Sequence, residues 1–311
     1  MLPESRWREL LYRESPTRSM RLHFWRGGTT RQADQPNGTI DHGFLRNDFR
    51  GATLVWKPDP SAFLQYVTLL ADRVPSFESY PFSIPAIRHL DQLPLHPKVT
   101  YFVGENGTGK STLLEAIAVV EGFNPEGGSR HFNFTTRDTH STLGQCLRLG
   151  RGIRRLKDAD GFFLRAEGFY NTATYIDRIA DPAYLERHFG GIAPHERSHG
   201  ESFFSLLLDR FRGNGLYLFD EPESALSPMR QMSLLAIMHE LIGSGSQFLI
   251  ATHSPIVMAY PDAAIYHFSA AGIQPIAYTE TENYKVTKAF LGRHEQMIAE
   301  LFDMRGMQPA D

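Results

Sequence analysis

The chain has 311 residues, of which 41% are hydrophobic and 22% are charged, a composition typical of a globular protein with a sizeable core. Its formal charge of −3 gives no overall attraction to nucleic acid or to anionic membranes. A single cysteine, Cys146, excludes an intrachain disulfide and a thiolate metal site, and favours a reducing cytoplasmic location. No apolar run approaches the roughly 20 residues that span a bilayer, so we expect no membrane insertion.

Strands alternate with helices along most of the sequence. After a strand candidate at 20–25 and a loop at 27–43, apolar patterns predict strands at Val99–Val103, Phe162–Leu164, Leu216–Phe219 and Phe248–Ala251. They predict helices at Leu113–Val120, Phe203–Phe211 and Met229–Ile242. Strand candidates at Ala264–Phe268 and Ile273–Ala277 precede helical sequence to about Met304. This alternation predicts an α/β fold with a mostly parallel central sheet.

A glycine-rich segment between the first predicted strand and helix of this core fits a phosphate-binding loop. Gly104 to Ser111 has the pattern glycine, four residues, glycine, lysine, serine, in the strand–loop–helix context that the pattern requires. Lys110 would reach the β- and γ-phosphates of ATP, and the Ser111 hydroxyl would be a ligand of Mg²⁺. The candidate nucleotide-binding residues here are Gly104, Glu105, Asn106, Gly107, Thr108, Gly109, Lys110, Ser111 and Thr112.

Two carboxylates, Asp220 and Glu221, follow the apolar strand Leu216–Phe219. Parallel α/β sheets bind ligands at the carboxyl ends of their strands. Asp220 is therefore the second candidate Mg²⁺ ligand, and Glu221 the candidate general base for an attacking water. The alternative is an acidic pair that only caps the helix after it.

Three further segments resemble ABC-type ATPases in the family's order and approximate spacing. Asp220 to Ser227 resembles the junction of the second phosphate motif with the D-loop, and Ala251-Thr-His-Ser-Pro255 resembles the switch-histidine segment. Arg197 to Ser202 resembles the signature motif. The resemblance covers roughly Ile84 to Phe268. It is strongest to the small stand-alone predicted ATPases labelled AAA family ATPase, whose cores are similar to ABC and SMC heads.

This resemblance implies a P-loop NTPase fold with an ABC-like central sheet, a flanking antiparallel β part and a helical lobe. It also implies that Ser198, Gly200 and Glu201 meet the nucleotide of a second subunit, and that His253 senses the γ-phosphate, as catalytic partner of Glu221 and Lys110. His199 replaces a glycine of the usual signature, and Ser227 replaces the usual D-loop aspartate. His253 could instead be structural, and Ser198 with Glu201 could form a helix-capping box.

We therefore expect an N-terminal extension over 1–60, an ATPase core over 61–268 with a lobe at about 121–200, and a C-terminal tail over 269–311. Phe77, Tyr80 and Phe82 are candidates for stacking on adenine, and core packing is the alternative for each. The Q-loop role, for which Gln145 is considered, is left unassigned.

A basic stretch at Arg148, Arg151, Arg154 and Arg155 could contact nucleic acid. An internally paired or solvated surface is the alternative, which the negative net charge favours. We expect a cytoplasmic Mg²⁺-dependent ATP hydrolase that forms a nucleotide-dependent homodimer, with a DNA-related, defence-related or other process driven through a partner protein. A nucleotide-gated binding module with little turnover is the runner-up, and a P-loop kinase is weaker.

Overall fold

The computed structural model describes residues 59–128, 142–154, 159–165, 211 and 213–305. All of them belong to the unit Phe49–Asp311. The predicted strand at 20–25 and almost all of the predicted helix Phe203–Phe211 lie outside the described residues.

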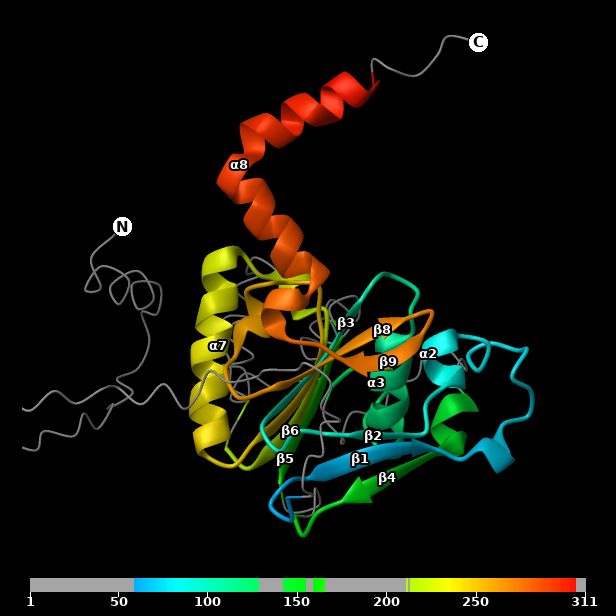
Figure 1. The fold of residues 1–311 in the computed structure, drawn as a ribbon. Helices are drawn as coiled ribbons and strands as arrows, with labels where there is room; N and C mark the ends of the chain where they lie inside the picture. The colour runs from blue at the N-terminus through cyan, green and yellow to red at the C-terminus, as the bar shows by residue number, and fades with distance from the viewer. Residues whose placement is uncertain (1–58, 129–141, 155–158, 166–210, 212, 306–311) are drawn as a thin grey trace, which may run out of the picture. The chain divides into compact units, whose positions relative to one another are not determined.

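The core of the described unit is a six-stranded sheet with the order β5-β6-β7-β3-β8-β9 (Figure 1). Five strands run parallel, and β9 pairs with β8 in the antiparallel sense. Every predicted core strand is present, with the bounds β3 Val99–Gly104, β5 Asp160–Arg165, β6 Gly215–Asp220, β7 Gln247–Ala251, β8 Ala264–Ser269 and β9 Gly272–Pro275. The expected α/β class with a mostly parallel sheet is confirmed.

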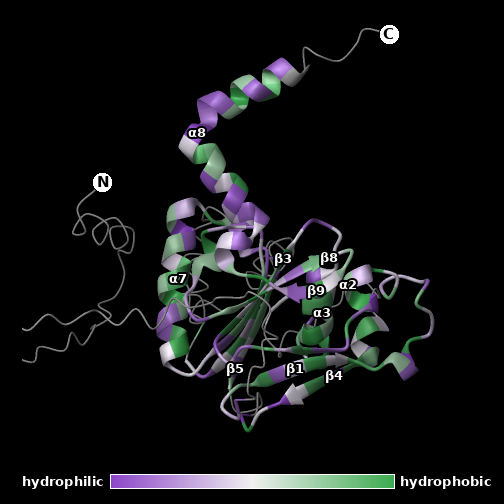
Figure 2. Ribbon diagram, viewed as in Figure 1, coloured by the Kyte–Doolittle hydropathy of each residue, from purple (hydrophilic) through white to green (hydrophobic). Residues whose placement is uncertain are grey.

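Helices α3 (Lys110–Val120) and α7 (Pro228–Gly243) cover opposite faces of this sheet. The strands alternate accordingly: Leu216 and Leu218 of β6 join the core on the α3 side, whereas Tyr217 and Phe219 join the core on the α7 side. Because both faces are buried, the strands are almost continuously apolar, as Figure 2 shows for the centre of the sheet. Both helices match the sequence prediction.

A separate antiparallel sheet with the order β2-β1-β4 forms the flanking β part. Its strands are β1 Leu64–Leu69, β2 Gln92–Pro94 and β4 Leu147–Arg151. Their apolar residues pack in the same core cluster as α3, so this helix lies between two sheets. β4 falls inside the expected lobe at about 121–200, and of its side chains only Leu147 and Leu149 point into the core.

The remaining helices are short, apart from the last one. Helix α2 spans Pro85–Arg88 and α8 spans Glu282–Arg305, which fulfils the expected C-terminal helix. The 3₁₀ helices are η1 Ala71–Arg73, η2 Thr142–Cys146, η5 Pro222–Ala225, η6 Val257–Ala259 and η7 Tyr278–Glu280. No helix in the described part of the chain is both long and apolar enough to cross a membrane.

Candidate nucleotide site

The glycine-rich loop joins β3 to α3 and owes its shape to three glycines in backbone conformations that favour glycine. Gly104, Gly107 and Gly109 have φ angles of 140°, 80° and 97°. A β-carbon at Gly104 would lie 2.3 Å from the carbonyl oxygen of Phe268, whereas one at Gly107 would meet nothing within 4 Å. The loop is therefore closely packed against β8 at its start and open at Gly107, where a ligand could approach the backbone.

Lys110 begins α3 with its ammonium group directed back into this loop. Its Nζ donates hydrogen bonds to the carbonyl oxygens of Gly104 at 2.9 Å and Glu105 at 2.7 Å. The residue is 4% exposed, and burial lowers the pKa of its amine, an effect that the nearby carboxylates of Glu221 and Asp220 oppose. The loop carbonyls hold the amine beneath the loop, where a phosphate could replace them as its partners.

Ser111 and Asp220 meet although they are far apart in the sequence. The Ser111 hydroxyl donates to Asp220 Oδ1 at 2.7 Å, and the side chain of Asp220 is 8% exposed. Hydroxyl and carboxylate oxygens are the ligands that Mg²⁺ prefers, and this ion usually keeps several waters and phosphate oxygens as its other ligands. The two residues therefore fit the role of a Mg²⁺ site whose remaining positions come from a nucleotide.

Glu221 and His253 follow the neighbouring strands β6 and β7 and face each other. Glu221 has a left-handed backbone (φ 49°, ψ 52°), and its amide donates to the Ala251 carbonyl at 2.9 Å. This unusual conformation holds its carboxylate, which is 43% exposed, so that Oε1 lies 3.7 Å from His253 Nε2. His253 Nε2 is buried and has no hydrogen-bond partner among the described residues.

The charge state of His253 follows from its surroundings. Burial lowers the pKa of the imidazole, and the Lys110 ammonium lowers it further, whereas Glu221 and Glu223 act in the opposite direction. Above its usual pKa the ring is therefore neutral. A neutral imidazole can offer Nε2 either as donor or as acceptor to a ligand between it and Glu221.

The sequence motifs give no role to Glu223. Its side chain connects the acidic segment after β6 to the histidine segment after β7. It lies in η5, and its carboxylate accepts from the His253 amide at 2.5 Å and from the Thr252 hydroxyl at 2.8 Å. Thr252 is fully buried. Because these bonds join residues about thirty positions apart, no local pattern could reveal them.

Arg165 is a second residue that the sequence analysis missed. It ends β5 in register with Asp220, and its Nε lies 3.7 Å from Asp220 Oδ2. Its Nη1 donates to Glu115 Oε2 of α3 at 2.8 Å. The guanidinium thus borders the candidate metal site and connects it to the helix that begins at Lys110. Its position at the end of a strand next to β6 is the only sequence signal for it.

The three aromatic candidates for adenine stacking differ in the structure. Phe82 is fully buried and Phe77 packs against the same core, so both serve packing. Tyr80 is 71% exposed, and its hydroxyl lies 3.4 Å from Thr112 Oγ1 in the first turn of α3. Tyr80 is therefore the candidate that lies beside the phosphate loop with its ring accessible.

Other predicted site residues either lie outside the described part or have structural partners. Ser198, Gly200 and Glu201 lie outside it, as do His199 and Arg155. Ser227 caps α7, since its hydroxyl accepts from the Arg230 amide. Gln145 is exposed in η2, ahead of β4.

The described arginines of the basic stretch are largely engaged within the chain. Arg151 pairs with the buried carboxylate of Glu121 at 2.8 Å. Arg154 donates to the Gly245 carbonyl and lies 5.8 Å over the ring of Phe63. Arg148 is exposed on β4. These contacts favour the internally paired alternative for Arg151 and Arg154 over a continuous nucleic-acid patch.

The loop between β3 and α3, with the acidic end of β6 beside it, defines the P-loop class of the fold. Two family models match the chain in the segments that carry these features. A model described as "AAA domain" matches residues 77–164, and one described as "AAA domain, putative AbiEii toxin, Type IV TA system" matches residues 190–259. Their descriptions agree with the expected resemblance to P-loop ATPases of the AAA type.

Individual relatives are distant. The macrolide export ATP-binding/permease protein MacB of Hahella chejuensis is 22% identical over 249 residues, which are 68% of this chain and 35% of that protein. The chain therefore spans about a third of that relative's length. The SMC head domain from Thermotoga maritima is 17% identical, with a TM-score of 0.39 over 70% of this chain and 100% of that one. An ATP-binding cassette of an ABC transporter in its ADP conformation is 18% identical, with a TM-score of 0.40 over 68% and 89% of the two chains.

Proposed function

We propose that this chain binds ATP together with Mg²⁺ and hydrolyses the γ-phosphate bond. The observation that carries the proposal is the convergence of Lys110, Ser111, Asp220, Glu221 and His253 at the carboxyl ends of β3, β6 and β7. Each side chain has the chemistry that a different part of a Mg²⁺–ATP hydrolysis site requires.

The phosphate loop and the first turn of α3 would bind the nucleotide. The open backbone at Gly107 and the helix N-terminus favour an anionic phosphate, and the Lys110 ammonium adds a positive charge beneath it. Ser111 and Asp220 would hold the metal, which neutralises phosphate charge when bound. The accessible ring of Tyr80 would contact the adenine.

Glu221 and His253, which face this loop, would carry out hydrolysis. The exposed carboxylate of Glu221 can accept a proton from an attacking water. The neutral imidazole of His253 has a ring nitrogen without a partner among the described residues, which suits a contact to that water or to the phosphate. The strained backbone of Glu221 fixes the carboxylate in this position.

We further propose that nucleotide closes a homodimer in which Ser198, Gly200 and Glu201 of one protomer meet the phosphate of its partner. The cellular process driven by this cycle, DNA-related, defence-related or other, would then depend on partner proteins. A cytoplasmic site of action is consistent with the single cysteine, Cys146, which is buried. The alternative function is a nucleotide-gated binding module in which ATP sets dimer state with little turnover.

Phosphate release and nucleotide binding, measured on the same variants, test this proposal. Glu221→Gln should lower kcat by about 10²–10⁴-fold and keep ATP affinity, because the general base is lost and the binding loop is intact. Lys110→Ala should lose ATP binding itself. Equal and slow phosphate release by wild type and both variants would leave only the binding module, and absent ATP binding by the wild type would contradict both functions.

A further inference from the structure

Arg165 ends β5 at a point where two strands and a helix meet. Its backbone is in register with Asp220 at the end of β6, and its Nε lies 3.7 Å from Asp220 Oδ2. Its Nη1 donates to Glu115 Oε2 of α3 at 2.8 Å and to the carbonyl oxygen of Pro125, beyond the end of that helix, at 3.4 Å. Because a guanidinium carries its donors in a rigid plane, these contacts from separate elements fix its orientation.

Asp220 presents one carboxylate oxygen to each of two neighbours. Oδ1 accepts from the Ser111 hydroxyl at 2.7 Å, and Oδ2 faces the Arg165 guanidinium. Only 8% of the Asp220 side chain is exposed, so its attraction to the arginine is screened less than it would be at the surface. Rotation of the carboxylate plane would loosen both contacts at once. Its orientation is therefore defined from two sides.

Helix α3 supplies both ends of this arrangement. Ser111 and Glu115 are four residues apart in α3, which places their side chains one turn apart on the same face of the helix. Ser111 contacts Asp220 directly, and Glu115 is connected to it through Arg165. The side chains of Arg165 and Glu115 are 29% and 15% exposed, and charge-assisted hydrogen bonds of this kind are strong. The helix, the arginine and the carboxylate of β6 thus form a closed ring of contacts.

We propose that Arg165 is a positioning residue for the metal site, which holds Asp220 so that Oδ1 stays beside Ser111 as a ligand of Mg²⁺. This inference rests on the proposed function and names a further residue on which that function depends. Loss of a residue that holds a metal ligand in place typically lowers metal affinity by about 10–100-fold. The positive charge of Arg165 alone would have the opposite effect, because it repels a cation. The sign of the change therefore separates orientation from charge.

The gain in ATP affinity that Mg²⁺ provides tests this role. The gain is the ratio of the dissociation constant in EDTA to that in excess Mg²⁺, measured with a fluorescent, non-hydrolysable ATP analogue. Arg165→Ala should lower this ratio by about 10-fold through weaker binding in Mg²⁺, and should leave binding in EDTA unchanged, because Lys110 and the phosphate loop are intact. Arg165→Lys should lower the ratio by a similar factor, since an ammonium group lacks the planar fork that meets both Glu115 and Asp220.

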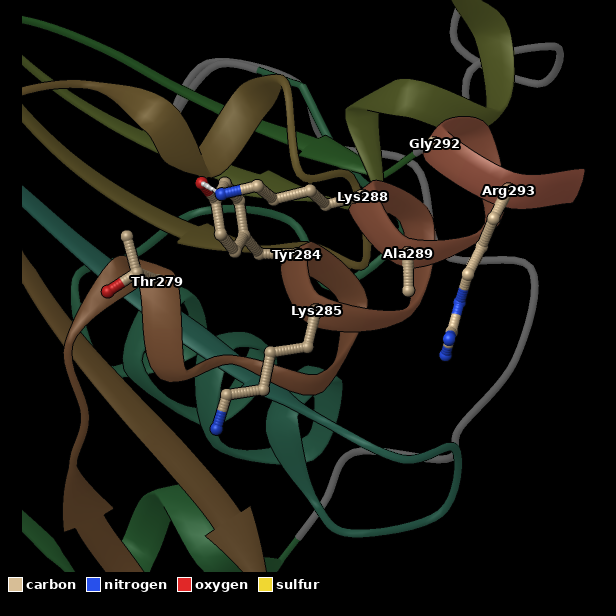
Figure 3. A pocket seen from close by; sticks show the side chains of 7 residues that line it. All are labelled: Thr279, Tyr284, Lys285, Lys288, Ala289, Gly292 and Arg293. Carbon is tan, nitrogen blue, oxygen red and sulfur yellow. Dashed lines mark hydrogen bonds between the residues drawn. The ribbon is translucent and has the colours of Figure 1, made fainter.

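Arg151→Ala is the matched control, because Arg151 pairs with the buried carboxylate of Glu121 at the other end of α3, at 2.8 Å. Arg293→Ala removes an exposed arginine that lines an open hollow of about 590 Å³ on α8 (Figure 3). Both variants should keep the wild-type ratio. Glu115→Gln removes the charge that anchors Arg165 and should lower the ratio by less than Arg165→Ala does. It decides the question if Arg165→Ala does not fold.

Thermal unfolding in EDTA accompanies each binding measurement. A destabilised Arg165→Ala protein that keeps the wild-type ratio would show a structural role only and would overturn the proposal. A higher ratio, which indicates charge repulsion, or an Arg165→Lys protein that behaves as wild type would also overturn it. Weaker ATP binding in EDTA would do the same, because it indicates a direct contact to the nucleotide. A wild type that binds no ATP would instead contradict the proposed function, so the two failures are distinct.

Discussion

The carboxyl edge of the central sheet and helix α8 differ in how their functional groups are supported. At the sheet edge, contacts between strands and helices position each polar side chain, as with Ser111 against Asp220 and Glu223 against the histidine segment. On α8, by contrast, large apolar side chains such as Leu291 and Phe302 are exposed. Chemistry at the first region therefore depends on precise internal packing, whereas function at the second depends on what covers it.

Alanine substitutions at three glycines should give the largest difference in unfolding free energy between the two regions. Gly104→Ala should destabilise the protein by about 2–4 kcal/mol and abolish ATP binding, because its β-carbon would overlap the Phe268 carbonyl in a backbone with φ of 140°. Gly292→Ala on α8 meets nothing within 4 Å, and because alanine favours a helix more than glycine does, it should stabilise the protein by about 0.5–1 kcal/mol instead. Thermal or denaturant unfolding of each variant gives the comparison.

Gly107→Ala is the control within the loop, since it has the same kind of backbone but open space around it. Its cost should be about 1 kcal/mol from backbone strain alone. Equal destabilisation by Gly104→Ala and Gly107→Ala would show that packing against β8 contributes nothing, and would remove the contrast between the sheet edge and α8.

Glu223→Ala should have the next largest effect, and it tests whether this residue positions the histidine segment. The change leaves the Thr252 hydroxyl and the His253 amide without their acceptor, so we expect a loss of about 1–3 kcal/mol in unfolding free energy. ATP hydrolysis should fall about 10-fold in kcat with little change in ATP affinity, because the binding loop is untouched.

Glu280→Ala is the matched control, because this exposed carboxylate pairs with the exposed Lys285 at the start of α8. Exposed pairs contribute little, so stability and kcat should both stay close to wild type. If Glu223→Ala raised KM and left kcat unchanged, its carboxylate would act on nucleotide binding, and the positioning role would be wrong.

The sequence predicts the central sheet well because its strands are buried on both faces and stand out as apolar runs. The antiparallel sheet is expected only as a general feature of the family resemblance, since Leu147 and Leu149 are separated by Arg148 and followed by Arg151, which suggest a basic patch. The phosphate-loop residues and the acidic pair Asp220 and Glu221 can also be predicted, because they directly follow apolar strands. Glu223 and Arg165 act through contacts between distant segments, which depend on strand order and helix packing rather than on any local pattern.

The smallest predicted effect is a pH dependence that comes from His253. Because burial lowers the pKa of this imidazole below its ordinary value of 6.5, the unfolded chain binds a proton that the folded chain does not as pH falls below about 6.5. The contribution of His253 to stability is therefore fully present above that pH and declines as the pH falls from about 6.5 through the lowered pKa. Burial shifts the pKa of His96 in the same direction, so His253→Gln should reduce the slope of Tm between pH 7 and 5 without abolishing it.

The same protonation should also act on hydrolysis, because an imidazolium at position 253 would pair with Glu221 and compete with the water for its carboxylate. We expect the wild-type rate to fall on the acid side below about pH 6.5, where ATP binding itself should change less. Lys285→Glu on α8 should leave this profile unchanged, since it lies outside the sheet edge. An acid limb that is identical in wild type and His253→Gln would exclude His253 as its origin and would leave Glu221 to act without this partner.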